Sequence, residues 1–132
     1  MARPGTRQFL LDTVFVYNFS SPVEKYYEIH STDSLQTSDV TLFRILKELL
    51  LNDYKIYEMS QKQGDLIPYH SHAHKEILAV SEGNVRVIVE EDIVDLKKGD
   101  IITIKPWAVH LSCFPFDKGA FFYLCHPLKK TR

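Results

Sequence analysis

One stretch of about twenty residues, 64–83, constrains the fold of this 132-residue chain more than any other. It is bounded by two glycines and carries three histidines and one glutamate: His70, His72, His74 and Glu76. Because side chains on an extended strand alternate between two faces, His70, His72 and Glu76 can point the same way. Imidazoles with a carboxylate suit Zn, Fe, Mn, Co or Ni better than Ca or Mg. The pattern therefore predicts a strand that carries part of a metal site.

A fourth ligand can come from further along the chain. Gly99 and Asp100 precede an apolar segment, and His110 follows it. A pair of histidines on a strand often lies at the surface and binds no metal. Any one of these histidines alone would favour that interpretation. A histidine from a separate strand would close a metal site, so the full set favours metal binding.

These two segments resemble the motifs of the cupin family. The first family motif, G-x5-H-x-H-x3-E-x6-G, is matched without a gap over residues 64–83. The second motif, G-x5-P-x-G-x2-H-x3-N, is matched at its first glycine and its histidine, Gly99 and His110. Its proline, second glycine and asparagine are replaced, in that order, by Lys105, Trp107 and Phe114.

The resemblance implies an all-β fold, a cupin-like jelly roll or double-stranded β-barrel. It also implies a divalent metal, Fe, Mn, Ni, Co or Zn, held by His70, His72, Glu76 and His110. Such a set fills four of the six positions of an octahedral ion and leaves two for water, substrate or oxygen. The resemblance makes dioxygenase-like chemistry on a small molecule the leading reaction class, with isomerisation or metal-assisted hydrolysis behind it.

Two other functions stay open. The barrel could be a non-catalytic module that binds or senses a small ligand with a bound metal. It could also be a barrel that has lost its metal, although the four intact ligand positions argue against this. Neither case involves DNA directly, because the sequence shows no helix-turn-helix.

Length and charge indicate the number of domains and the kinds of partner to expect. The chain fits one domain spanning residues 1–132, with a loose tail at 1–8 and the barrel core at 54–126. A net charge of −1 gives no electrostatic reason to bind nucleic acid or a membrane surface. Without a signal-peptide pattern or a membrane-length apolar run, we expect a cytoplasmic protein. The resemblance adds a homodimer, in which the apolar segment 10–19 could extend a neighbour's sheet.

Short strands separated by turns are expected from residue 54 onward, a pattern typical of a closed all-β fold. They cover residues 54–60, 67–72, 77–80, 85–89, 93–96, 101–104, 109–114 and 120–125, with a tight turn at 82–84. Two earlier strands are predicted at 10–19 and 24–30. The cysteines, Cys113 and Cys125, are expected to be buried free thiols, with one bridge between them left open.

One helix is predicted, over residues 40–51, just before the histidine stretch. Its apolar stripe consists of residues spaced by three and four: Leu42, Ile45, Leu46 and Leu49. Ser38 or Asp39 is expected to cap its start. The stripe is expected to pack against the barrel, with docking of a second subunit as the alternative.

Four further side chains have open roles. His74 could be a fifth ligand or a proton shuttle, but a turn position at the barrel mouth is favoured, as the family resemblance implies. Trp107 could line a pocket for a planar ligand or fill the space left by the missing glycine. Tyr123 and His126 could approach the cavity as an acid or base. For His126, which precedes Pro127, an exposed place at a strand end is favoured.

Overall fold

The computed structural model describes residues 26–36 and 41–128. The strand predicted at 10–19 and the tail at 1–8 lie outside these ranges. The described residues form eight strands and one helix: β1 (Tyr27–Ser31), α2 (Leu42–Leu50), β2 (Tyr54–Gln61), β3 (Leu66–His70), β4 (Glu76–Val89), β5 (Asp92–Lys97), β6 (Asp100–Ile104), β7 (His110–Cys113) and β8 (Ala120–Pro127). The expected all-β fold with one short helix before the histidine stretch is confirmed. In the same residues, no helix is long and apolar enough to cross a membrane.

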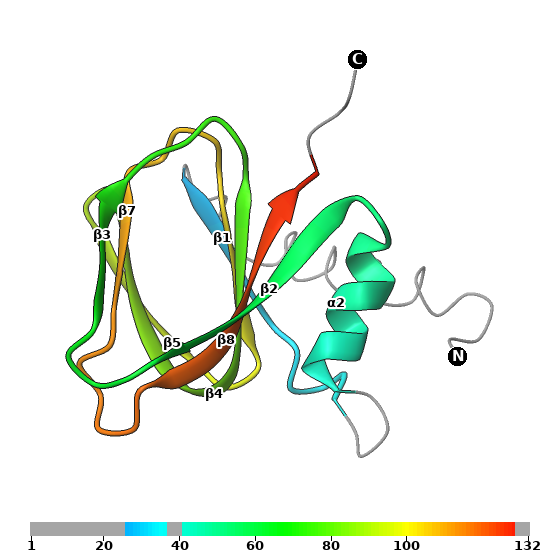
Figure 1. Cartoon of the computed structure of the whole chain (residues 1–132), viewed down its shortest axis with the longest axis horizontal. Coiled ribbons are helices and arrows are strands. Elements are labelled where there is room, and N and C mark those ends of the chain that lie inside the picture. Colours follow the sequence, from blue (N-terminus) through cyan, green and yellow to red (C-terminus); the bar gives the residue numbers. More distant parts are fainter. Residues whose placement is uncertain (1–25, 37–40, 129–132) are drawn as a thin grey trace.

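Strand β4 is shared by two antiparallel layers of a β-barrel. Its first half pairs with β6 and β8, and its second half pairs with β5 and β7. Strands β1 and β2 extend the first layer at β6 and β8, and β3 extends the second layer at β7. Figure 1 shows how these strands curve around one interior, which gives the jelly-roll arrangement expected from the sequence.

The prediction of a tight turn at residues 82–84 is wrong, because β4 continues through these residues. Gly83 has a φ of 78°, and the pairing with β8 is irregular between Val80 and Glu82. Such a bulge adds one residue and reverses which positions face inward. Before it the even-numbered Val80 lies in the core, and after it the odd-numbered Val85 does. The bulge thus lets one strand bury apolar side chains in both layers.

Apolar side chains from both layers fill the barrel. The largest fully buried members of this core are Leu78, Leu96, Ile102, Ile104, Phe114 and Phe122. A second buried cluster covers the outer face of the first layer, where Leu42 and Leu46 of α2 join Ile77 and Ala79 of β4. Figure 1 shows α2 on the outside of the barrel beside β2. The prediction that the helical stripe packs against the barrel is therefore confirmed.

The helix begins later than predicted. Its N-cap is Thr41, whose hydroxyl oxygen accepts a hydrogen bond from the backbone N–H of Arg44. Threonine supplies the same kind of acceptor as the predicted caps Ser38 and Asp39, but directly before the first turn. The predicted cap is therefore wrong by two to three residues.

Both cysteines are free thiols, so the bridge left open by the sequence does not form. Cys125 is buried, whereas Cys113 is partly exposed. Burial, reinforced by the nearby Glu76 carboxylate, raises the pKa of the Cys125 thiol to about 12. Since the thiolate is the reactive form, Cys125 is chemically inert at neutral pH.

The bulge can be tested with a pair of glycine substitutions. A methyl group on residue 83 would collide with the backbone carbonyl oxygen of Gly119, whereas one on Gly64 would meet nothing within 4 Å. Both glycines have positive φ, which costs a side chain about 1–2 kcal/mol. We expect Gly64→Ala to lower the free energy of unfolding in urea by about that amount, and Gly83→Ala by clearly more. Equal losses would contradict the close approach of residues 83 and 119.

Candidate metal centre

Four side chains meet at one end of the barrel. His70 ends β3, Glu76 begins β4 and His110 begins β7, while His72 lies in the loop between β3 and β4. One ligand atom from each of the four residues lies within 4.8 Å of the others. Two atoms bound to one ion at about 2.1 Å are at most roughly 4.2 Å apart, so binding needs only a small inward shift. The group is therefore able to hold a metal ion.

Strand register brings these residues together, though not as the sequence suggested. His70 and His110 are directly opposite each other on the neighbouring strands β3 and β7. Glu76 shares its parity with core residues of β4, so it points into the barrel. The prediction that one extended strand carries both His70 and His72 is wrong, because β3 ends at His70. A hydrogen bond of 2.8 Å from Trp107 N–H to the carbonyl of His72 connects that loop to the one before β7.

Backbone carbonyls orient the three imidazoles. Nδ1 of His70, His72 and His110 each lies within 2.9 Å of a carbonyl oxygen two residues away. A carbonyl oxygen only accepts, so Nδ1 donates and Nε2 of the neutral ring keeps its lone pair. In this neutral form the buried Nε2 atoms of His72 and His110 receive no hydrogen bond, because the carboxylate of Glu76 beside them is also an acceptor. Buried lone pairs held in this way fit a metal ion, which needs the same arrangement of anchored imidazoles.

The buried carboxylate of Glu76 controls the protonation of the group. Burial alone would raise its pKa, but contacts with His110 and His126 outweigh burial and lower the pKa to about 2. Burial would lower the pKa of His110, yet Glu76, with Oε2 at 3.2 Å from Nε2, raises it. At His72 the burial of the ring dominates and lowers the imidazole pKa. At neutral pH the carboxylate and His72 are thus ready ligands, while a proton competes at His110.

His126 belongs to this cluster, so the favoured interpretation of an exposed strand end is wrong. Its Nε2 lies 2.8 Å from Oε1 of Glu76, and its side chain is 32% exposed. Strand β8 continues to Pro127, and its pairing with β4 places Cys125 opposite Ile77, beside the glutamate. No local signal in the sequence fixes this pairing.

His74 and Tyr123 do not join the four possible ligands. The ring of His74 stacks on that of His72, with centroids 4.1 Å apart, and lies in the loop where a turn residue was expected. Tyr123 is buried in the cluster beneath α2, on the outer face of the sheet. The idea that Tyr123 approaches the cavity as an acid or base is therefore wrong.

Trp107 stands in solvent near the centre. Its side chain is 67% exposed, so the hypothesis that it fills the space of a missing glycine is wrong. Its φ of 67° is the left-handed conformation that the family's glycine would adopt at no cost. A bulky residue held there is strained, and such strain gathers at functional sites.

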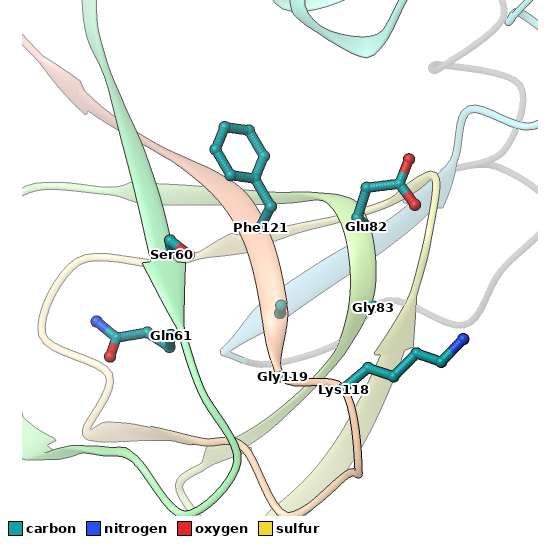
Figure 2. Close-up of a pocket in the computed structure, with 8 residues that line it drawn as sticks. Ser60, Gln61, Glu82, Gly83, Lys118, Gly119 and Phe121 are labelled. Carbon is teal, nitrogen blue, oxygen red and sulfur yellow. The ribbon is translucent and has the colours of Figure 1, made fainter.

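Pockets in the described part of the chain lie at both ends of β8. One, of about 400 Å³, adjoins His72 and Glu76 through the side chains of His74 and His126. Its lining consists of Lys55, Tyr57, His74, His126, Pro127 and Leu128. The other, of about 270 Å³, lies where β8 begins, at the opposite end of that strand. Figure 2 shows the side chains of Gln61, Glu82 and Lys118 around it pointing away from one another. Polar groups do not converge there, so it adds nothing to the site.

Comparison with known proteins identifies the family of this chain. A family profile described as "Cupin domain" matches residues 57–125, which is more than half of the sequence. The chain belongs to the cupin family. Among curated proteins, no sequence matches it.

Solved structures support the same fold. A cupin-2 domain-containing protein from Halorhodospira halophila is 14% identical, with a TM-score of 0.56, over 85% of this chain and 69% of its own. A predicted oxalate decarboxylase from Thermotoga maritima is 18% identical, with a TM-score of 0.54, over 78% and 81%. An RmlC-like cupin from Shewanella frigidimarina is 23% identical, with a TM-score of 0.52, over 59% and 69%. At these identities the likeness shows the fold alone.

Proton competition at His110 predicts that metal affinity depends on pH. Because its pKa is raised above the usual 6.5, a fall in pH through that raised pKa protonates a ring that must be neutral to bind metal. We expect the affinity for Zn²⁺ to fall by about tenfold for each pH unit below that pKa. Titration calorimetry in buffers of different ionisation enthalpy would count the proton released. A constant affinity with no proton release would contradict the assignment.

The strain at Trp107 predicts an unusual stabilisation. Trp107→Gly should relieve about 1–2 kcal/mol of left-handed strain and lose part of this gain to unfolded-state entropy. We expect a net gain in the free energy of unfolding of about 1 kcal/mol. Trp107→Ala removes the same ring but keeps the strain, so it should give no gain. Equal effects of the two substitutions in urea unfolding would show that the backbone is not strained.

Proposed function

We propose that this protein is a metal-dependent cupin, and that His70, His72, Glu76 and His110 hold one divalent transition metal for chemistry on a small molecule. The buried Nε2 atoms of His72 and His110 support this most directly. In the neutral rings their lone pairs receive no hydrogen bond, and the rings are held in place through Nδ1. Orphaned buried polar atoms are costly, and a metal ion would satisfy both.

The donor set favours some metals over others. Three imidazole nitrogens and one carboxylate oxygen suit Fe, Mn, Co, Ni or Zn, whereas Mg and Ca prefer all-oxygen sites. The single charge of Glu76 would offset half the charge of a divalent ion. The carboxylate is already ionised at neutral pH, since its pKa is about 2.

Dioxygenase-like chemistry is the reaction class that we propose first. An ion in such a site would have two open positions and could polarise a substrate or bind dioxygen. The protein's own residues would position the ligands, and Phe114, in place of the family's asparagine, is buried in the barrel core. One structural relative is described as a predicted oxalate decarboxylase, so small carboxylates belong in a substrate screen.

A non-catalytic role is the second candidate. The pocket of about 400 Å³ next to the ligand residues favours it, because a small molecule could bind there without touching the four ligand atoms. Saturable binding without turnover in the metal-loaded protein would favour this sensing or binding function. Turnover would favour the enzyme.

Three broader expectations remain part of the proposal. We propose a cytoplasmic homodimer that has small-molecule rather than nucleic-acid or membrane partners. The net charge of −1 supports the choice of partners. Exposed apolar side chains on and beside α2, Phe43 and Leu51, support a contact between subunits.

Metal content provides the test of the proposed centre. We expect the purified protein to contain about one transition-metal ion per chain by elemental analysis. His72→Ala and His110→Ala should each lose it, because each removes an anchored ligand, with an affinity loss above roughly 100-fold. His74→Ala is the matched control, since it removes a neighbouring histidine outside the group.

The identity of the metal would decide the next step. Stoichiometric Fe, Mn, Ni or Co would justify oxygen-uptake assays with small enols, diols and thiols. Stoichiometric Zn would favour hydrolysis or a structural role. If no metal were bound after reloading, or if both ligand variants kept full occupancy, the proposed centre would be wrong.

A further inference from the structure

His126 contacts a proposed metal ligand without belonging to the ligand set. Its Nε2 lies 2.8 Å from Oε1 of Glu76, closer to the carboxylate than Nε2 of His110 at 3.2 Å or Nε2 of His72 at 3.5 Å. The other carboxylate oxygen, Oε2, lies 3.2 Å from Nε2 of His110. The two oxygens of Glu76 therefore face different partners.

The direction of the hydrogen bond follows from the chemistry of the two groups. An ionised carboxylate only accepts, so Nε2 of His126 must carry the hydrogen and donate it to Oε1. The Glu76 side chain is only 7% exposed, which leaves little room for water to replace this donor. Rotation of the carboxylate would break the bond to His126, so the bond fixes its plane.

The ring of His126 is itself held by rigid elements. Its backbone pairs with Lys55 of β2, one pair from the end of an eight-residue antiparallel ladder. The ring contacts that of Tyr57 edge-on, with centroids 5.7 Å apart, and that of His74 at 4.7 Å. A donor fixed on a paired strand and braced by two rings is already oriented before any metal arrives.

We propose that His126 is a positioning residue that holds Glu76 so that one carboxylate oxygen, Oε2, is presented to the metal. The inference rests on the proposed function, because it assumes that the four residues bind an ion. A hydrogen bond to a ligating carboxylate orients it and tunes its donor strength, and loss of such a partner typically costs 10–100-fold in metal affinity.

The ring of His126 also connects the buried Glu76 to a pocket that small molecules can reach. The ring forms part of the wall of the 400 Å³ pocket, together with Lys55 and Leu128. Glu76 is therefore a single hydrogen bond away from a surface that solutes can reach, although the carboxylate itself is buried.

A pair of substitutions of similar size separates hydrogen bonding from packing. His126→Leu removes the donor, and we expect it to weaken Zn²⁺ or Co²⁺ binding by about 10–100-fold in competition with a chromophoric chelator. His126→Gln can place an amide N–H near the same point and should recover most of the affinity. Leu128→Ala alters the same pocket without touching Glu76 or the rings that hold His126, and should change affinity by less than about threefold.

The visible spectrum of the Co²⁺ form supplies a second readout. Its bands depend on coordination number, so freeing the carboxylate should change them in His126→Leu and leave them close to wild type in His126→Gln. Should His126→Leu fail to fold by circular dichroism, His126→Ala takes its place in the comparison.

The outcomes distinguish this inference from the proposed function. If the wild-type protein binds no metal, the proposed function fails. If wild type binds metal and His126→Leu binds it equally well with the same spectrum, the function stands and the positioning role is overturned. Equal weakening by Leu and Gln would also overturn it, because the ring would then matter through its shape and not through its hydrogen bond.

Discussion

A buried carboxylate surrounded by imidazoles is the interaction on which this end of the barrel depends. Removing a charge from water is costly unless partners replace the lost hydration. For Glu76 the partners are His110 and His126, and they more than offset burial, since the carboxyl pKa falls to about 2. The same interaction raises the pKa of His110, so without metal the group relies on a proton to balance its charge. A proton and a divalent cation thus compete for one electrostatic role.

Much of the candidate site could be predicted from the sequence, but the prediction depended more on motif spacing than on a physical argument. The spacing of the motif identified the four residues that the fold brings together. The argument from strand parity did not, because β3 ends at His70 and His72 lies in a loop. The spacing corresponds to a strand, a turn and a second strand. Only the family resemblance identified this spacing as that of a metal site.

Contacts that depend on strand pairing could not be predicted from the sequence. His126 looked like the exposed end of a strand, but β8 pairs with the strand that begins at Glu76. Gly83 looked like a turn, since a glycine between polar residues is typical of one, yet it occupies a bulge within β4. In both cases local preference was overridden by partners more than thirty residues away in the chain.

The sharing of β4 has a consequence for how the barrel comes apart. Because this strand pairs with β5, β6, β7 and β8, neither layer can open fully without disturbing the other. Strands tied together in this way exchange their amide hydrogens mainly through cooperative opening of the whole unit. Since Glu76 is the first residue of that strand, an ion bound at the barrel rim would slow exchange throughout the core, far from its own coordination sphere.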